Sequence, residues 1–434
     1  MIEWAATQSR LGVMRKSAMR KREIIELRIE TMAHGGEALG RHNGKVFFVQ
    51  EAIPGELVRA EIVEDRRRWA RAQLLSVLDA SPFRIEPPCP YFGRCGGCQW
   101  QHVDYDRQLE YKRQVLLSQL RRLGHLPDAL VRPTIGMAQP WHYRNHVQFA
   151  QNARGQLGFR EARSHQIVAV QHCLLLHPLL EGFYGRRDWK SLQLRQLSLR
   201  AGIHTGERLV ILETADDLVP EYPGGDEFSC VHRLSDGTHR VLSGEAAYHE
   251  RLRDRQYHIS ASSFFQVNTL QAEALLGIIQ AYTQPKPSDT LLDVYCGVGA
   301  IGLSMHADLG RVIGIEEHPA AVQDARINAQ GVDQVTFLQG KAEVVVPELE
   351  ENISKVVVDP PRSGCKAELI DALVRLAPLR LVYVSCDPAT LARDAARLTQ
   401  DGYELVHIQP VDMFPQTYHI ETVSLWQPLE RHNQ

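Results

Sequence analysis

Residues 259–434 alternate short apolar runs with helix-like stretches, and this pattern constrains the fold more than any other feature of the chain. A helix is expected over 269–283, directly before the first run. The alternation predicts an α/β fold with a parallel, doubly wound, Rossmann-like sheet. Ligands bind such sheets beyond the carboxyl ends of the strands, so functional residues are expected there. The runs lie at 290–295, 312–316, 335–338, 355–359, 381–386 and 405–411.

Length and composition limit what the rest of the chain can be. The 434 residues predict two or three domains, and 44% apolar with 23% charged residues is typical of a soluble globular protein. No run approaches the roughly 18 apolar residues of a membrane span, and residues 1–10 lack a signal-peptide pattern. We therefore expect a cytoplasmic protein without membrane contact. The net charge of −3 excludes neither RNA nor small-molecule substrates, because local patches matter more than the sum.

The N-terminal part reads as short strands separated by glycine-rich turns. Strands are expected at 24–29, 46–49, 57–63 and 72–77, and Asn43-Gly44 is a strong hairpin signal. Such strands in a short segment predict a small barrel of the OB type. After an irregular segment at 81–98, the spacing of apolar residues predicts a helix over 105–123 that buries Leu123 and ends at Gly124. Residues 144–258 read mostly as strands.

Basic residues gather in two runs, one within residues 15–22 and one at 66–71 around Trp69. Basic residues interleaved with an aromatic one are typical of a phosphate-binding surface. Ordinary solvated charges are the alternative. Arg144 and His146 are further candidate RNA contacts, with ordinary surface positions again as the alternative.

A glycine-rich loop follows the first apolar run of the α/β region. Gly297, Gly299 and Gly302 match a dinucleotide fingerprint, which is a weak signal alone. Asp293, an acid inside the strand, makes the loop resemble the first motif of class I methyltransferases and favours S-adenosylmethionine over NAD. Glu316 ends the second run, where a carboxylate can accept hydrogen bonds from ribose hydroxyls.

Cys386 stands between an expected strand and an expected helix. Asp387 suits the N-cap and Pro388 the first turn of that helix. The positive end of a helix favours a thiolate, which is the reactive form of cysteine. A buried and inert cysteine is the alternative. Two carboxylates flank Cys386 in sequence: Asp359, before a stiff Pro-Pro turn, and Glu421, which ends an aromatic and proline-rich loop at 412–421.

Three ordered motifs, Asp359-Pro-Pro-Arg-x-Gly, Val382–Thr390 and Val411–Glu421, resemble the signatures of the RNA uracil-5-methyltransferase family. The resemblance spans nearly the whole chain. It implies a TRAM barrel at 18–79, a central iron–sulfur domain at 80–258 and a class I methyltransferase domain at 259–434. It implies catalytic roles for Cys386 and Glu421. The cofactor-contacting positions that it implies are Gln266, Tyr295, Gly297, Glu316 and Asp359.

Four cysteines, Cys89, Cys95, Cys98 and the distant Cys173, resemble the iron–sulfur site of the bacterial 23S rRNA branch of that family. The resemblance implies a [4Fe–4S] cluster and 23S rRNA as substrate, with tRNA as the alternative, and a monomer that does not act on DNA. Spacing alone leaves structural zinc open, since four thiolates can hold either. The spacing does not match the C-x3-C-x2-C pattern of radical S-adenosylmethionine enzymes.

The implied mechanism follows from the chemistry of uracil. Carbon 5 is too weak a nucleophile until a thiolate adds at carbon 6, which is covalent catalysis. A base must then remove the carbon 5 proton. Asp387 stands where relatives commonly have Asn, and its charge is expected to raise the pKa of the Cys386 thiol. Ala300 replaces a polar residue of some relatives. An RNA-binding protein without catalysis and an NAD oxidoreductase are competing classes.

Overall fold

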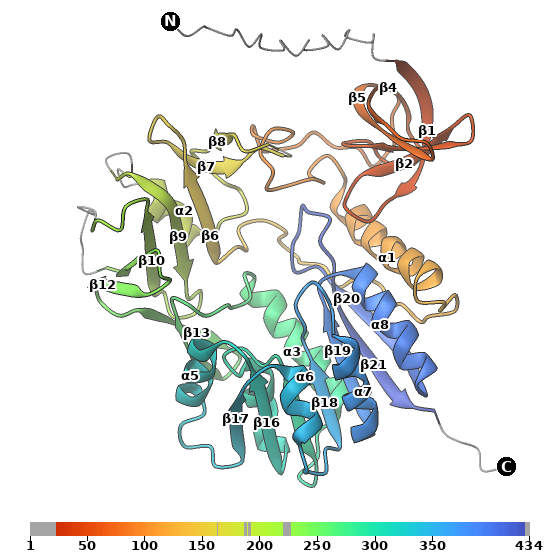
Figure 1. Ribbon diagram of the computed structural model, residues 1–434. Helices are drawn as coiled ribbons and strands as arrows, with labels where there is room; N and C mark the ends of the chain where they lie inside the picture. Colours follow the sequence, from red (N-terminus) through yellow and green to blue (C-terminus); the bar gives the residue numbers. More distant parts are fainter. Residues whose placement is uncertain (1–22, 163, 186–188, 190–191, 220–226, 430–434) are drawn as a thin grey trace, which may run out of the picture. The chain divides into compact units, whose positions relative to one another are not determined.

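The computed structural model describes residues 23–162, 164–185, 189, 192–219 and 227–429 (Figure 1). The basic run within residues 15–22 lies outside this part of the chain. The described residues form two compact units. The first contains residues up to 31 and 38–81, and the second contains 32–37 and the residues from 82 onward. Among the described residues, no helix is long and apolar enough to cross a membrane.

The first unit is a small closed barrel, as the turn pattern predicts. Its strands follow the order β1-β2-β3-β5-β4, with β1 paired again to β4. Ile25, Leu27 and Ile29 alternate with exposed residues along β1 and fill the interior. Asn43 and Gly44 both have positive φ, the conformation that a two-residue hairpin turn requires. The strands are β1 (Ile24–Met32), β2 (Ala38–His42), β3 (Lys45–Val49), β4 (Leu57–Asp65) and β5 (Trp69–Asp79).

The arginine run of the barrel is exposed and partly ion-paired. Arg66 and Arg71 both reach Glu64, at 2.9 and 3.1 Å. The Arg71 guanidinium also lies 5.0 Å from the Trp69 ring centre, a cation–π distance. Arg67 and Arg68 are exposed beside them. The turn between β4 and β5 therefore presents a basic surface with an aromatic side chain in it.

Among the described residues of 146–260, strands are the main regular elements, as expected. One sheet has the order β12-β11-β10-β9-β6-β7-β8, in which β10 and β11 are parallel and the other neighbours antiparallel. Helix α2 packs on it, and β13 and β14 form a separate hairpin. The bounds are β6 (His146–Gln151), β7 (Leu157–Arg160), β8 (Ile167–Ala169), α2 (Pro178–Gly185), β9 (Leu194–Ala201), β10 (Arg208–Thr214), β11 (Ser229–Arg233), β12 (His239–Ser243), β13 (Ala247–Leu252) and β14 (Arg255–Ser260).

The C-terminal part of the second unit is a doubly wound sheet of order β17-β16-β15-β18-β19-β21-β20. Its neighbours from β17 to β19 are parallel, as predicted, whereas β21 is antiparallel to both β19 and β20. The bounds are α3 (Thr269–Thr283), β15 (Thr290–Val294), α4 (Ala300–Met305), η1 (His306–Asp308), β16 (Arg311–Glu316), α5 (Pro319–Asn328), β17 (Val335–Gln339), α6 (Ala342–Val345), η2 (Val346–Glu348), β18 (Lys355–Val358), α7 (Ala367–Leu376), β19 (Arg380–Ser385), α8 (Pro388–Gln400), β20 (Tyr403–Val411) and β21 (Glu421–Pro428).

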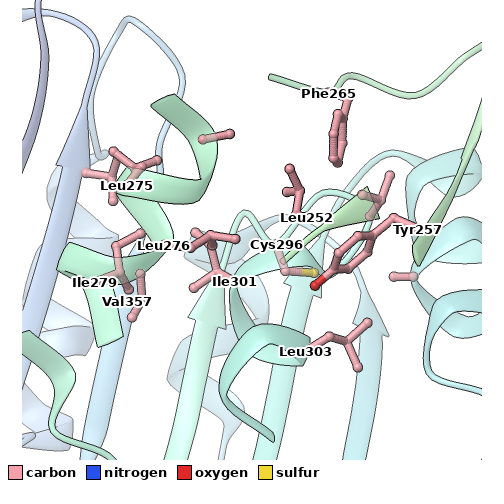
Figure 2. Packing of buried hydrophobic residues seen from close by; sticks show 14 of the residues in the cluster. Leu252, Tyr257, Phe265, Leu275, Leu276, Ile279, Cys296, Ile301, Leu303 and Val357 are labelled. Atoms are coloured by element: carbon pink, nitrogen blue, oxygen red, sulfur yellow. The ribbon is translucent and has the colours of Figure 1, made fainter. Parts of the chain in front are cut away.

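Apolar side chains cover both faces of this sheet. Along β18, Val357 joins one core, and Val356 and Val358 join the other. The first core includes residues of α3, α4 and α5, and the second includes residues of α6, α7 and α8. Figure 2 shows part of the first core, in which Leu276 and Ile279 of α3 lie near Val357. A sheet buried on both faces explains why its strands are continuous apolar runs.

Helix α1 (Tyr105–Arg122) packs against α8 and adds Leu116 and Leu120 to the second core. Its C-cap is Leu123 rather than Gly124, and Leu123 is 47% exposed, so its predicted burial is wrong. The buried face of α1 is also partly polar, which an amphipathic pattern does not predict. The polar residues on it are Gln108, Lys112 and Gln119.

We expect Leu120→Ala to lower the free energy of unfolding by about 2–5 kcal/mol, because it leaves a cavity where Leu120 is fully buried. Leu123→Ala, one turn farther along the same helix, should change it by less than about 0.5 kcal/mol. Urea unfolding followed by fluorescence measures both. Equal losses in the two variants would contradict the packing of α1 on α8.

Candidate active site

Cys386 lies between the end of β19 and the start of α8, as predicted. The Asp387 carboxylate caps α8 by accepting hydrogen bonds from the amides of Ala389 and Thr390, both at 2.9 Å. Pro388 occupies the first turn. The thiol is thus held at a rigid strand-to-helix junction.

Glu421 is brought beside Cys386 by the sheet itself. Ser385 and Thr422 are paired across the antiparallel strands β19 and β21, so the residues that follow and precede them are neighbours. Asp359 follows β18, which is parallel to β19, and therefore lies at the same edge. Three groups that lie far apart in sequence meet at one sheet edge.

Burial sets the electrostatics of this edge. Together with the carboxyls of Glu421 and Asp359, it raises the pKa of the Cys386 thiol to about 11, whereas Arg362 opposes the rise. Burial also raises the pKa of Asp359 to about 6 and that of Glu421 well above its usual range. Arg362 opposes the rise at Glu421 too. The expected preference for a thiolate at the helix start is outweighed in the free protein.

Sequence reasoning assigned no role to Arg362. It follows Asp359-Pro360-Pro361 in the motif, and its charge acts on both Cys386 and Glu421. The sequence signal that could have indicated a role is a cation in a proline turn directly after the end of a strand.

The expected effect of Asp387 is corrected by the structure. Burial and the carboxyls of Glu421 and Asp359, rather than Asp387, raise the pKa of the thiol. The His34 imidazole, from segment 32–37 of the same unit, lies 3.4 Å from the Asp387 carboxylate. This contact and the two capped amides lower the pKa of Asp387 to about 2. The carboxylate is directed to the helix end and to His34.

A hollow of about 200 Å³ lies at the carboxyl ends of β15 and β16. Tyr295 and Glu316 line it, together with Lys341 and residues of the turn 361–366. Glu316 accepts hydrogen bonds from the amides of Gly297, at 3.0 Å, and His318, at 2.8 Å. Its carboxylate is therefore fixed in place with lone pairs left over for a further donor.

The glycine loop beside this hollow is shaped by Asp293. The buried Asp293 carboxyl accepts from the amide of Gly302, at 2.8 Å, and burial raises its pKa to about 7. Its Oδ1 has no hydrogen-bond partner among the described residues. A Cβ atom at Gly297, where φ is +54°, would meet nothing within 4 Å. Open space above a loop backbone beside a fixed carboxylate fits an adenosyl cofactor.

The predicted cofactor residues are only partly gathered around the hollow. Tyr295 and Glu316 line it, and Gly297 donates to Glu316. Asp359 follows β18, which stands between β15 and β19 in the sheet, so it lies between this region and the thiol. Gln266 is not among the lining residues, and its carbonyl accepts from Asn145, at 3.0 Å.

The four predicted cysteine ligands, Cys89, Cys95, Cys98 and Cys173, line one cavity of about 260 Å³. Burial raises the pKa of Cys98 to about 12 and that of Cys173 to about 11. Thiols of this kind stay protonated unless a metal holds them. Among the described residues, no group of three or more His, Cys, Asp or Glu side chains is arranged to hold a single metal ion.

His146 lines the same cavity and is half-buried. Burial lowers the pKa of His146 to about 3, and its Nε2 has no partner among the described residues. The Arg144 Nε donates to the His146 carbonyl at 2.8 Å, and Arg144 is half-buried beside the cavity. Neither side chain is an ordinary exposed contact.

The fold and the hollow beside the glycine loop fit a class I, S-adenosylmethionine-dependent methyltransferase. Residues 247–428 match the family model described as tRNA (Uracil-5-)-methyltransferase, and residues 19–75 match the TRAM domain. An uncharacterized RNA methyltransferase of Halalkalibacterium halodurans is 36% identical over 94% of this chain and 98% of its own. An uncharacterized RNA methyltransferase of Thermosynechococcus vestitus is also 36% identical, and the match covers 92% of this chain and 97% of that protein. The chain therefore belongs to the RNA uracil-5-methyltransferase family.

A solved structure supports the same assignment. The tRNA (uracil-54, C5)-methyltransferase of Pyrococcus abyssi, in complex with S-adenosyl-L-homocysteine, is 27% identical with a TM-score of 0.73. The match covers 92% of this chain and 99% of that one. The small barrel is thus a TRAM domain, and the protein is an RNA methyltransferase that uses S-adenosylmethionine.

We expect Gly297→Ala to weaken S-adenosylmethionine binding strongly, because its Cβ would occupy the open space beside Glu316. The left-handed backbone adds a strain of about 1–2 kcal/mol. Gly331→Ala is the matched control, since Gly331 also has positive φ and open space but follows α5. Isothermal titration calorimetry should find binding lost only in Gly297→Ala. Normal binding by that variant would contradict the cofactor site.

Proposed function

We propose that the protein methylates carbon 5 of a uridine in RNA through a covalent adduct, with Cys386 as nucleophile and Glu421 as base. The observation that carries this proposal is the meeting of Cys386, Glu421 and Asp359 at one sheet edge. A thiol beside a carboxyl of raised pKa combines the two functions that the reaction needs.

The Cys386 thiolate adds to carbon 6 of the uracil and forms a C–S bond. The C5=C6 electron pair moves into an enolate, so carbon 5 gains carbanion character. S-adenosylmethionine, when bound, supplies the electrophilic methyl group that carbon 5 takes up. Arg362 favours the thiolate, because its positive charge lowers the pKa of Cys386.

Glu421 then removes the carbon 5 proton. The C–H electron pair restores the C5=C6 bond, and the thiolate leaves carbon 6. A carboxylate whose pKa is raised by burial is a stronger base than an ordinary one. Asp359 is proposed to accept a hydrogen bond from a ring N–H and to orient the base. The target uridine must lie in a loop or be flipped out, which costs a few kcal/mol.

The cofactor residues are proposed to be Gln266, Tyr295, Gly297, Glu316 and Asp359. Support comes from the hollow that Tyr295 and Glu316 line, and from the open space at Gly297. Glu316 would accept from the ribose hydroxyls, and Gly297 would let the backbone approach the amino-acid part. For Gln266 and Asp359, the support is the resemblance of their motifs to those of the family. The methyltransferase domain is proposed to begin near residue 259, after a central domain at 80–258.

We further propose that Cys89, Cys95, Cys98 and Cys173 hold a [4Fe–4S] cluster. Four thiols that line one cavity are the donor set such a cluster requires. The thiolates of a cluster bind four different irons, so they stand farther apart than the ligands of one ion. The cluster would fold the irregular segment 81–98 and shape an RNA surface; the methyl transfer needs no redox step from it. Structural zinc is the competing occupant.

The proposed substrate is 23S rRNA, and the protein is proposed to act as a monomer. The cysteine set supports this choice, because it resembles that of the 23S rRNA branch. A tRNA substrate is the second candidate, favoured by the substrate of the Pyrococcus abyssi enzyme. The exposed arginines of the barrel, around Trp69, would serve either RNA through its phosphates.

Transcripts of 23S rRNA segments and of tRNA that contain 5-fluorouridine test both the chemistry and the substrate. Fluorine cannot leave as a proton, so the methylated adduct should persist on a denaturing gel with wild-type protein and S-adenosylmethionine. Cys386→Ala should form no adduct, while Cys230→Ala, a buried cysteine of β11, should form as much as wild type. An adduct that survives Cys386→Ala would refute the nucleophile. An adduct with tRNA alone would reassign the substrate.

Iron and acid-labile sulfide in protein purified without oxygen test the cluster. We expect about four of each per chain, and much less in Cys98→Ser, because a thiolate ligand is removed. Cys230→Ser should keep wild-type content. About one zinc per chain without sulfide would instead identify a structural zinc site.

A further inference from the structure

Loop 412–420, which joins β20 to β21 and leads into Glu421, is held by residues from outside the methyltransferase domain. We propose that Lys112 of α1 and Asp412 form a positioning pair that keeps this loop closed over the Glu421 carboxyl. The inference rests on the proposed role of Glu421 as base and names residues that determine how well that base works.

The pair is fully buried. The Lys112 Nζ lies 2.5 Å from the Asp412 Oδ1, and both side chains are 0% exposed. Lys112 also donates to the Phe414 carbonyl at 3.1 Å, and the Tyr105 hydroxyl donates to the Asp412 Oδ2 at 2.9 Å. Lys112 thus holds the loop at the Asp412 side chain and at the Phe414 backbone carbonyl.

A second contact from α1 lies one turn before Lys112. The Gln108 Nε2 donates to the Gln416 Oε1 at 3.0 Å, and the Gln416 amide donates back to the Gln108 Oε1 at 3.1 Å. Gln416 has a φ of +69°, which is unusual for a residue other than glycine. Residues 105, 108 and 112 lie on one face of the helix, so a single rigid element fixes both ends of the segment 412–416.

A buried ion pair contributes little net stability, since apolar residues of the same size often replace it without loss. In this proposal the pair favours the described loop conformation, in which Lys112 has two acceptors. The backbone of Glu421 is already fixed by pairing with Val411. The loop leads directly into Glu421, whose side chain is buried, so under this proposal the loop controls how much water reaches the carboxyl.

The affected step is the last one. The C5–H bond breaks, the proton passes to Glu421, the electron pair forms C5=C6, and the C6–S bond breaks with its electrons on the Cys386 sulfur. If the loop opens, water reaches Glu421 and makes it a weaker base. Proton removal then slows while thiol addition and methyl transfer continue. The methylated RNA–protein adduct should accumulate.

The decisive variant is the double substitution Lys112→Met/Asp412→Leu in the full-length protein. Each single substitution leaves a buried charge without its partner and should lower the melting temperature, whereas the double variant should recover much of that loss. On ordinary uridine RNA with S-adenosylmethionine, the double variant should release product roughly tenfold more slowly, with several-fold more adduct by denaturing gel and mass spectrometry. This loss is smaller than the 10²–10⁴-fold expected for removing a general base.

Lys355→Met/Asp289→Leu is the matched control. That pair is also buried, at 3.7 Å, but it lies at the amino end of β18, away from Glu421. It should accumulate no adduct. Gln108→Leu removes the second contact of α1 without leaving a buried charge, and it should also accumulate adduct. If the double variant melts far below wild type, Gln108→Leu tests whether α1 positions the loop.

The outcomes separate the two proposals. Glu421→Gln should accumulate the most methylated adduct, and its failure to do so would refute the base itself. If Glu421→Gln accumulates adduct while the double variant and Gln108→Leu both turn over like wild type, the positioning pair is refuted and the base stands.

Discussion

The antiparallel pairing of β19 with β21 is the contact on which the active site depends. Because Ser385 opposes Thr422, Cys386 and Glu421 become neighbours although a helix, a strand and a loop separate them in sequence. The parallel neighbour β18 adds Asp359 to the same edge. A shift of one residue in this pairing would turn the Glu421 side chain to the opposite face of the sheet. The register of the sheet therefore sets the relative positions of Cys386, Glu421 and Asp359.

Burial then dominates the behaviour of the grouped side chains. It raises the pKa of the thiol and of both carboxyls, and the mutual repulsion of their charges acts in the same direction. The helix start offers a thiolate only about 0.3–1 kcal/mol, and the Asp387 carboxylate already caps its amides. The charge of Arg362, which lowers the pKa of both Cys386 and Glu421, is therefore important for the thiolate although the residue lies in a turn. A dry site holds Cys386 as a thiol and, under the proposed mechanism, makes Glu421 a better base.

Features that repeat locally could be predicted from the sequence. The strand runs, the helix 269–283, the hairpin at Asn43-Gly44 and the cap at Asp387 all have short-range signals. The antiparallel direction of β21 and the place of His146 in the cysteine-lined cavity have none, because they depend on partners far along the chain. The pairing of Cys386 with Glu421 could be predicted from the three ordered motifs that resemble a family, and not from the periodicity of apolar residues.

The loop that leads into Glu421 depends on residues outside the methyltransferase domain as well as on the sheet. Buried carbonyls need donors, and those of this loop find them outside residues 247–428 as well as inside. The Pro415 carbonyl accepts from the Tyr143 hydroxyl, and the Gln416 carbonyl accepts from the amides of Gln99 and Trp100, each at 3.1 Å. Each acceptor left without a partner would cost about 1–3 kcal/mol. The segment that carries Cys95 and Cys98 thus contacts the loop that leads into Glu421, so what folds that segment also shapes the proposed site of proton removal.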